Sequence, residues 1–180
     1  MEKQIRIKLF ILMMFLLLAA GCTKKIMVIV SPEVDGEMWV HNDSTNGFPV
    51  VINSQNVYVN ISGFNRSVNN QNLFNVGYDS GKDRLVCLHN GTYEMTYDIS
   101  TGNAGNNQEY QFLIGINGEE QENTDSHRKI GAAGDVGDAS DVGYIKCVEG
   151  DHVTLMSRNN DGNANLNVHS ASINIRRMRD

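Results

Sequence analysis

The sequence lacks the patterns that most often identify helices and catalytic centres. It has no apolar repeat of about 3.6 residues that is long enough to predict a helix. No Gly-x-Ser-x-Gly motif presents a nucleophilic serine. No metal-ligand spacing such as His-x-x-x-His connects the five histidines, which are His41, His89, His127, His152 and His169. We therefore expect an all-β protein without enzymatic activity.

The amino-terminal segment has the pattern of an export signal. A cationic start precedes an apolar run, Leu9 to Leu18, which is too short for a comfortable membrane span. The run ends in Leu-Ala-Ala-Gly-Cys at Cys22, which resembles a bacterial lipobox. This resemblance implies cleavage before Cys22 and acylation of its thiol, so that lipid holds the mature chain at the cell envelope. An ordinary cleaved signal with a coincidental cysteine, or an uncleaved anchor helix, is the alternative.

Positive charge is scarce as well. The chain carries 15 lysines and arginines against 21 aspartates and glutamates, which gives a net charge of −6. Removal of residues 1 to 21 takes away Lys3, Arg6, Lys8 and Glu2, so the mature charge is (15 − 3) − (21 − 1) = −8. This charge argues against a nucleic-acid partner and against direct binding to an anionic membrane surface.

Cysteine is rare, with three in 180 residues. When Cys22 is assigned to lipid, Cys87 and Cys147 are the one possible intrachain pair. Export to an oxidising compartment favours a disulfide between them. Two buried free cysteines on separate strands are the alternative.

Short β-type runs, separated by Asn, Asp, Ser and Gly, fill the chain from about Met38 onward. The clearest expected strand is Thr92 to Ser100, where apolar and polar residues alternate. A second strand, Tyr110 to Ile116, is followed by Asn117-Gly118, which is a strong hairpin signal. We also expect strands at Val50 to Ile52, Asn56 to Ile61, Arg84 to Leu88, Val142 to Cys147 and His152 to Met156.

The last segment changes phase. Leu166 and Val168 keep one alternation, whereas Ala171, Ile173 and Ile175 keep the opposite one. Because the side-chain period of a strand is two, this slip near Ser170 predicts a bulge or a bend.

Four fragments follow one another between about Gly36 and Met178. They are Leu85-Val-Cys-Leu-His-Asn-Gly91-Thr-Tyr93, the turn Asn117-Gly118, Tyr144-Ile-Lys-Cys-Val-Glu-Gly150-Asp151-His-Val153 and Ala171-Ser-Ile173-Asn-Ile175. Taken in this order, they resemble the tumour-necrosis-factor-like jelly-roll superfamily. That superfamily includes the globular heads of the first complement component and many bacterial spore-surface and bacteriophage virion proteins. The opening Gly36 to Trp39 and the loop 131 to 137 resemble the phage branch in particular.

This resemblance implies a sandwich of two antiparallel sheets that assembles as a homotrimer packed around apolar and aromatic side chains. It also implies that the glycine turns after Cys87 and Cys147 lie at one end of the sandwich. The aromatic residues should then divide between the core and the three-fold axis; these are Tyr93, Tyr97, Tyr110, Phe112 and Tyr144.

The expected organisation is a lipoprotein signal peptide (1–21), a lipidated tether (22–35) and a jelly-roll domain (36–180). We expect a lipid-anchored module of the outer membrane or cell surface that binds or displays a glycan or a protein. One alternative is a phage or prophage structural protein, associated with the virion or with the host envelope. Another is an envelope hydrolase built on a β-sandwich.

Two groups of residues are candidate ligand sites. Asp135, Asp138 and Asp141 lie among glycines and could supply oxygen ligands to calcium, although a solvated acidic loop is the favoured interpretation. Trp39, the one tryptophan, could form a stacking platform for a sugar ring with His41 beside it. For Trp39 we favour packing in a core or an interface. No other cofactor is expected.

Overall fold

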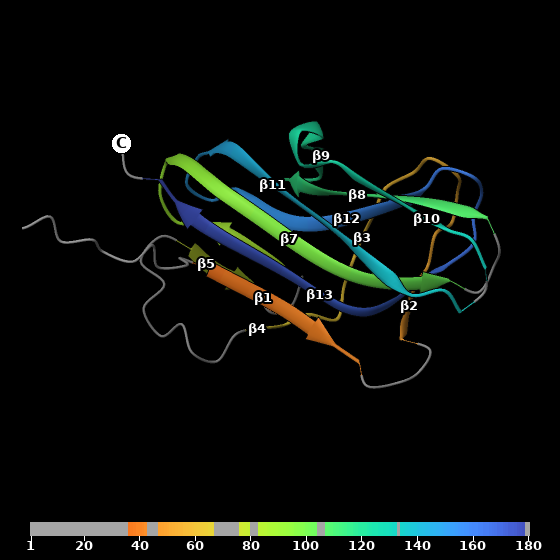
Figure 1. Ribbon diagram of the computed structural model, residues 1–180. Coiled ribbons are helices and arrows are strands. Elements are labelled where there is room, and N and C mark those ends of the chain that lie inside the picture. The colour runs from red at the N-terminus through yellow and green to blue at the C-terminus, as the bar shows by residue number, and fades with distance from the viewer. Residues whose placement is uncertain are drawn as a thin grey trace, which may run out of the picture. The chain divides into compact units, whose positions relative to one another are not determined.

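The computed structural model describes residues 36–42, 47–66, 76–79, 83–103, 107–132 and 134–178 (Figure 1). The signal peptide, Cys22 and the tether lie outside these residues. Within the described part, no helix has the length and apolar character needed to cross a bilayer. The one helical element there is a single 3-10 turn, η1 (Glu122–Thr124).

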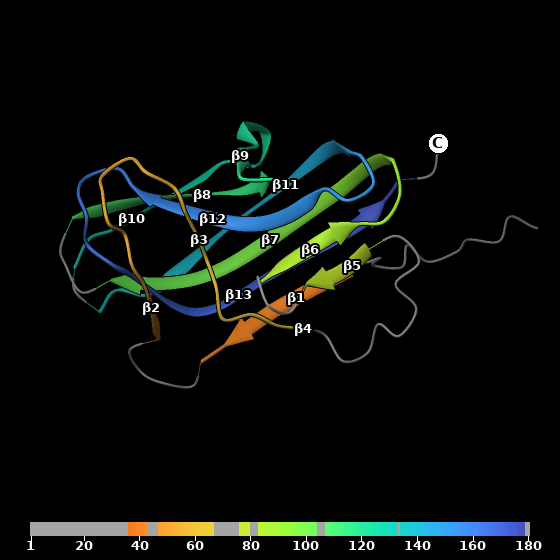
Figure 2. The same cartoon turned by 180° about the vertical axis from the view of Figure 1, so that it is seen from behind.

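The described strands form two antiparallel sheets, which Figures 1 and 2 show from opposite sides. Sheet A has the order β11-β7-β13-β1-β4, with β2 also paired to β13. Its strands are β1 (Gly36–His41), β2 (Phe48–Val50), β4 (Asn65–Arg66), β7 (Gly91–Asn103), β11 (Gly137–Cys147) and β13 (Leu166–Arg177). The strand order joins segments that are far apart in the sequence, as in the predicted jelly roll.

Sheet B has the order β10-β8-β12-β6-β5, with β3 on β12 and β9 on β8. Its strands are β3 (Val59–Asn60), β5 (Val76–Asp79), β6 (Arg84–Cys87), β8 (Gln108–Ile116), β9 (Glu119–Glu120), β10 (Ser126–Ile130) and β12 (His152–Asn159). The expected all-β jelly-roll sandwich is therefore confirmed.

The core lies between the two sheets and follows from the alternation in the sequence. On β7, the residues Tyr93, Met95, Tyr97 and Ile99 are all buried, as the pattern predicts. The Tyr97 hydroxyl joins the sheets, because it donates to the carbonyl oxygen of Phe112 (2.9 Å) or of Thr124 (3.0 Å) and pairs with Ser126 Oγ (2.6 Å). Burial raises the pKa of Tyr97, so the hydroxyl stays protonated and able to donate.

Two local predictions hold in detail. Asn117 and Gly118 both have positive φ, 54° and 86°, as a tight hairpin between β8 and β9 requires. The register of β13 against β7 shifts between Val168 and Ser170, where the apolar phase of the sequence changes. The extra residue lets Leu166 and Val168 face the same core as Ala171 and Ile173.

The remaining segments differ in detail from the expected pattern. The acidic run after the Asn117-Gly118 turn forms β9 and leads into η1. The strand expected over Asn56 to Ile61 is limited to β3. The predicted sharing of aromatic residues is uneven: four of the five are buried in the core, and Tyr144 alone, with 59% of its surface exposed, faces outward.

Candidate functional site

The face of sheet A that points away from sheet B carries the candidate site, and we call it the outer face. Along each strand, every second residue lies on this face and its neighbours are buried. The register aligns these residues in rows across β1, β13, β7 and β11. One row consists of Trp39, Ser172, Asp98 and Ser140.

A hydrogen-bonded row lies at the β11 side of the outer face. Tyr144 Oη donates to Glu94 Oε2 at 3.0 Å, and Arg176 donates to Glu94 Oε1 at 2.7 Å. The hydrogen bond to Glu94 raises the pKa of Tyr144. The Tyr144 side chain is thus anchored at its hydroxyl while 59% of the residue is exposed to solvent. Val142, two residues earlier on β11 and 48% exposed, extends this apolar surface.

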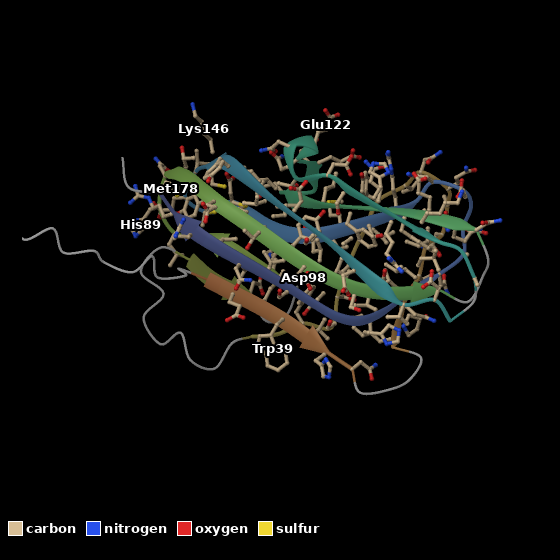
Figure 3. The ribbon with its side chains drawn as sticks, viewed as in Figure 1. Trp39, His89, Asp98, Glu122, Lys146 and Met178 are labelled. Carbon is tan, nitrogen blue, oxygen red and sulfur yellow. The ribbon has the colours of Figure 1, made fainter. Side chains whose placement is uncertain are left out.

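Trp39 lies at the other side of the outer face, on β1. Its side chain projects from the sheet (Figure 3), and 38% of the residue is exposed. His41 is exposed on the same face of the strand. The sequence favoured packing of Trp39 in a core or in an interface. Its exposure shows that Trp39 is not a residue of the intersheet core, and packing in an interface stays a prediction.

Asp98 supplies a carboxylate in the Trp39 row. Partial loss of hydration raises the pKa of Asp98, and the neighbouring carboxylate of Asp138 adds to this shift. Ser172 separates Asp98 from Trp39 in the register. An exposed indole beside hydroxyl and carboxylate groups is an arrangement that can stack an apolar ring and hydrogen-bond its substituents.

The three aspartates considered as calcium ligands do not converge. Asp135 accepts a hydrogen bond from Gly131 N at 3.4 Å and lies 3.5 Å from Arg128. Asp138 and Asp141 belong to β11 and, being three positions apart, point to opposite faces of that strand. Across the described residues, no group of three His, Cys, Asp or Glu side chains is placed to hold a metal ion. The geometry does not support the calcium prediction.

A histidine cluster on sheet B was not anticipated from the sequence. His127 Nδ1 lies 3.1 Å from Glu109 Oε1, and His127 Nε2 lies 3.1 Å from Asp125 Oδ2. The cluster continues through Asn160, which donates to Glu109 at 3.0 Å, and through Gln111, which donates to Asp125. The spacing Asp125-x-His127, which begins one residue before β10, was the available signal, but Glu109 joins only through the pairing of β8 with β10.

This cluster predicts a dependence of stability on pH. The hydrogen bond to Glu109, and that to Asp125, raise the pKa of His127 above its ordinary value of 6.5. Hydrogen bonds from Asn160 and His127 lower the pKa of Glu109 below 4.5. The raised His127 pKa contributes stability that is complete below 6.5 and is lost as the pH rises through the raised value. The lowered Glu109 pKa contributes stability that is lost as the pH falls through the lowered value.

We therefore expect His127→Gln to destabilise the protein more at about pH 5.5 than at about pH 8. The difference should be about 0.5 kcal/mol, because His127 is half exposed and solvent screens the pair. Urea unfolding at the two pH values measures it. Equal destabilisation at both values would show that the ring acts by packing alone.

The two core cysteines lie together, as the resemblance implies. Cys87 ends β6 and Cys147 ends β11, opposite Gly91. Both are buried free thiols in this structure, so the predicted disulfide is not formed in it. The hydrogen bond with Cys147, together with burial, raises the pKa of the Cys87 thiol.

The comparisons with known proteins establish the fold. The Eiger TNF protein from S. frugiperda superposes with a TM-score of 0.51 at 8% identity, over 80% of this chain and 92% of that chain. Murine APRIL gives a TM-score of 0.50 at 11% identity, over 79% and 98%. The globular domain of zebrafish complement 1qA gives 0.45 at 11% identity, over 80% and 98%. No protein-family model and no curated protein matches the sequence. The described fold is thus a tumour-necrosis-factor-like jelly roll.

Proposed function

We propose that this chain is a non-enzymatic binding module that acts as a homotrimer and is held at the cell envelope by lipid on Cys22. One observation carries the proposal. Among the described residues with placed side chains, the two exposed aromatic residues, Trp39 and Tyr144, both lie on the outer face of sheet A. Neither ring belongs to the hydrophobic core, so both are available to contact a partner.

The β11 side of the outer face is the proposed surface for self-association. Tyr144 and Val142 offer an apolar strip. The hydrogen bond from Tyr144 to Glu94, a carboxylate that Arg176 also binds, restrains the tyrosine before any partner arrives. A fixed ring loses little conformational entropy on burial. Three copies related by a closed rotation would each use the same strip, which avoids open-ended assembly.

The β1 side of the outer face is the proposed ligand site. Trp39 presents a flat apolar surface, and Asp98 and Ser172 supply polar groups in the same row. This combination fits a glycan, whose rings have an apolar face and hydroxyl groups at their edges. Three such sites on one trimer would bind a repeating surface glycan with avidity.

Lipid on Cys22 would place these sites at an envelope surface. The tether, residues 22–35, would hold the jelly roll off the membrane. The acyl chains would attach the protein to the membrane, because an acidic chain does not itself bind an anionic lipid surface. In this proposal the domain needs no cofactor, and its partners are other copies of itself, the lipid membrane and a surface glycan.

A glycan array tests the ligand proposal. The detergent-solubilised full chain should bind a subset of glycans, and Trp39→Ala should weaken that binding about tenfold, the value of roughly 1.4 kcal/mol of stacking. Val57→Ala, a change at an exposed valine on another surface, should leave it intact. Absence of binding to any glycan, or equal binding by Trp39→Ala, would overturn the assignment and direct attention to a protein ligand.

A further inference from the structure

Two thiols meet at one end of the sandwich, where the sheets come together. Cys87 belongs to sheet B and is 0% exposed, whereas Cys147 belongs to sheet A and is 3% exposed. A hydrogen bond with Cys147 is the largest cause of the raised pKa of Cys87, so the two thiols lie close together. The same end carries Lys146, His89 and Met178, which Figure 3 labels.

The backbone holds both cysteines in place through one short turn. Cys87 N donates to Asp151 O at 2.9 Å, and Gly150 N donates to Cys87 O at 2.8 Å. Cys147 immediately precedes this turn and is paired with Gly91 in the β7–β11 ladder. The turn therefore places one thiol from each sheet at the same end of the core, which is the placement that a bond between the sheets requires.

The two thiols differ in access from solvent. A pocket of about 290 Å³ opens at this end and is lined by Gly91, Thr92, Lys146, Cys147 and Val148. Cys87 does not line it. A small reagent in the pocket would therefore meet Cys147.

We propose that Cys147 and Cys87 form an oxidisable pair in which Cys147 reacts first with a small disulfide in the pocket and Cys87 then closes a bond between the sheets. The Cys147 thiol loses its proton and attacks one sulfur of the reagent, which releases one thiol and leaves a mixed disulfide. The Cys87 thiol then loses its proton and attacks Cys147 Sγ, which expels the second thiol. In total, two protons and two electrons pass from the cysteines to the reagent disulfide.

The closed bond would join β6 of sheet B to β11 of sheet A covalently. Such a link restricts the unfolded chain and should raise the thermal midpoint by several degrees. This inference does not depend on the trimer or on the ligand site. It gives the protein a reduced and an oxidised form that differ in stability and share one fold.

Reaction of the reduced chain with glutathione disulfide tests the order of events. The full chain is used with Cys22→Ser, so that Cys87 and Cys147 are its only thiols. Intact mass should show loss of two hydrogens, and a non-reducing peptide map should show Cys87 bonded to Cys147. Adding Cys87→Ser should leave one glutathionyl group on Cys147. With Cys147→Ser instead, Cys87 should react about tenfold more slowly than Cys147 does.

Further variants separate access through the pocket from loss of folding. Val148→Trp should narrow the pocket and slow the first step, whereas Val57→Trp, at a valine of similar exposure, should not. Cys147→Ala repeats the Cys147→Ser measurement without a buried hydroxyl, and thermal unfolding checks that each variant is folded. If Cys87 in folded Cys147→Ala reacts with glutathione disulfide as fast as Cys147 does in Cys87→Ser, the proposed order of reaction is wrong. If the chain with Cys22→Ser alone keeps a mixed disulfide and forms no bond between Cys87 and Cys147, the proposal of an oxidisable pair is wrong.

Discussion

Light scattering on the detergent-solubilised chain is expected to return about three times the mass of its monomer, after correction for bound detergent. Val142→Glu should reduce this to the monomer mass. Val142 is 48% exposed on the outer face, so a carboxylate there would keep its contact with water in a single subunit. In the trimer it would be buried without a partner, once in each of the three subunits, at a cost of several kcal/mol per charge.

A matched control separates this effect from a loss of folding. Val57 is 52% exposed but lies away from the outer face, on the segment leading into β3, so Val57→Glu should leave the trimer intact. The stability of the folded subunit itself should change little in Val142→Glu and in Val57→Glu, by no more than about 0.5 kcal/mol, as thermal unfolding measures. A monodisperse wild-type monomer at micromolar concentration would remove the self-association surface and the avidity expected from it.

The strands could be predicted because their information is local. In β7, burial of every second residue leaves a repeat that can be counted along the chain. The Asn117-Gly118 turn and the slip before Ser170 are also local, since each depends on residues within a few positions. These features hold wherever the strand is placed in the sheet.

The outer-face network could not be predicted because its information is in the register. Tyr144, Glu94 and Arg176 meet only because β7 lies between β11 and β13, and they come from distant parts of the chain. His127 and Glu109 meet in the same way, across β8 and β10. No periodicity within one segment indicates which segment pairs with it.

The calcium prediction shows a related limit. The sequence suggested that β11 begins at Val142, which left the three aspartates in a flexible loop. The strand instead begins at Gly137, because its pairing with β7 continues as far as Thr101. Two of the aspartates are therefore fixed on opposite faces of an extended strand, where their carboxylates cannot close around one ion.

Replacement of Cys22 by serine is expected to release the chain from the membrane fraction or to leave it as an uncleaved precursor. The thiol is the atom that accepts the diacylglyceryl group in the proposed lipobox, and a serine hydroxyl cannot replace it. Each buried methylene contributes about 0.8 kcal/mol, and one chain alone binds only marginally, so loss of all the acyl chains removes stable attachment.

Cell fractionation followed by intact-mass analysis measures this outcome. The wild-type chain should sediment with membranes, and its mass should show lipid on a new amino terminus at Cys22. Cys87→Ser is the control: it also removes one thiol but lies in the folded domain, so it should be lipidated and membrane-bound like the wild type. A soluble mature wild-type protein with an unmodified terminus at another residue would contradict the anchor. In that case the trimer and the Trp39 site could still operate, but as a secreted module, because nothing in the acidic chain itself would hold it to an anionic lipid surface.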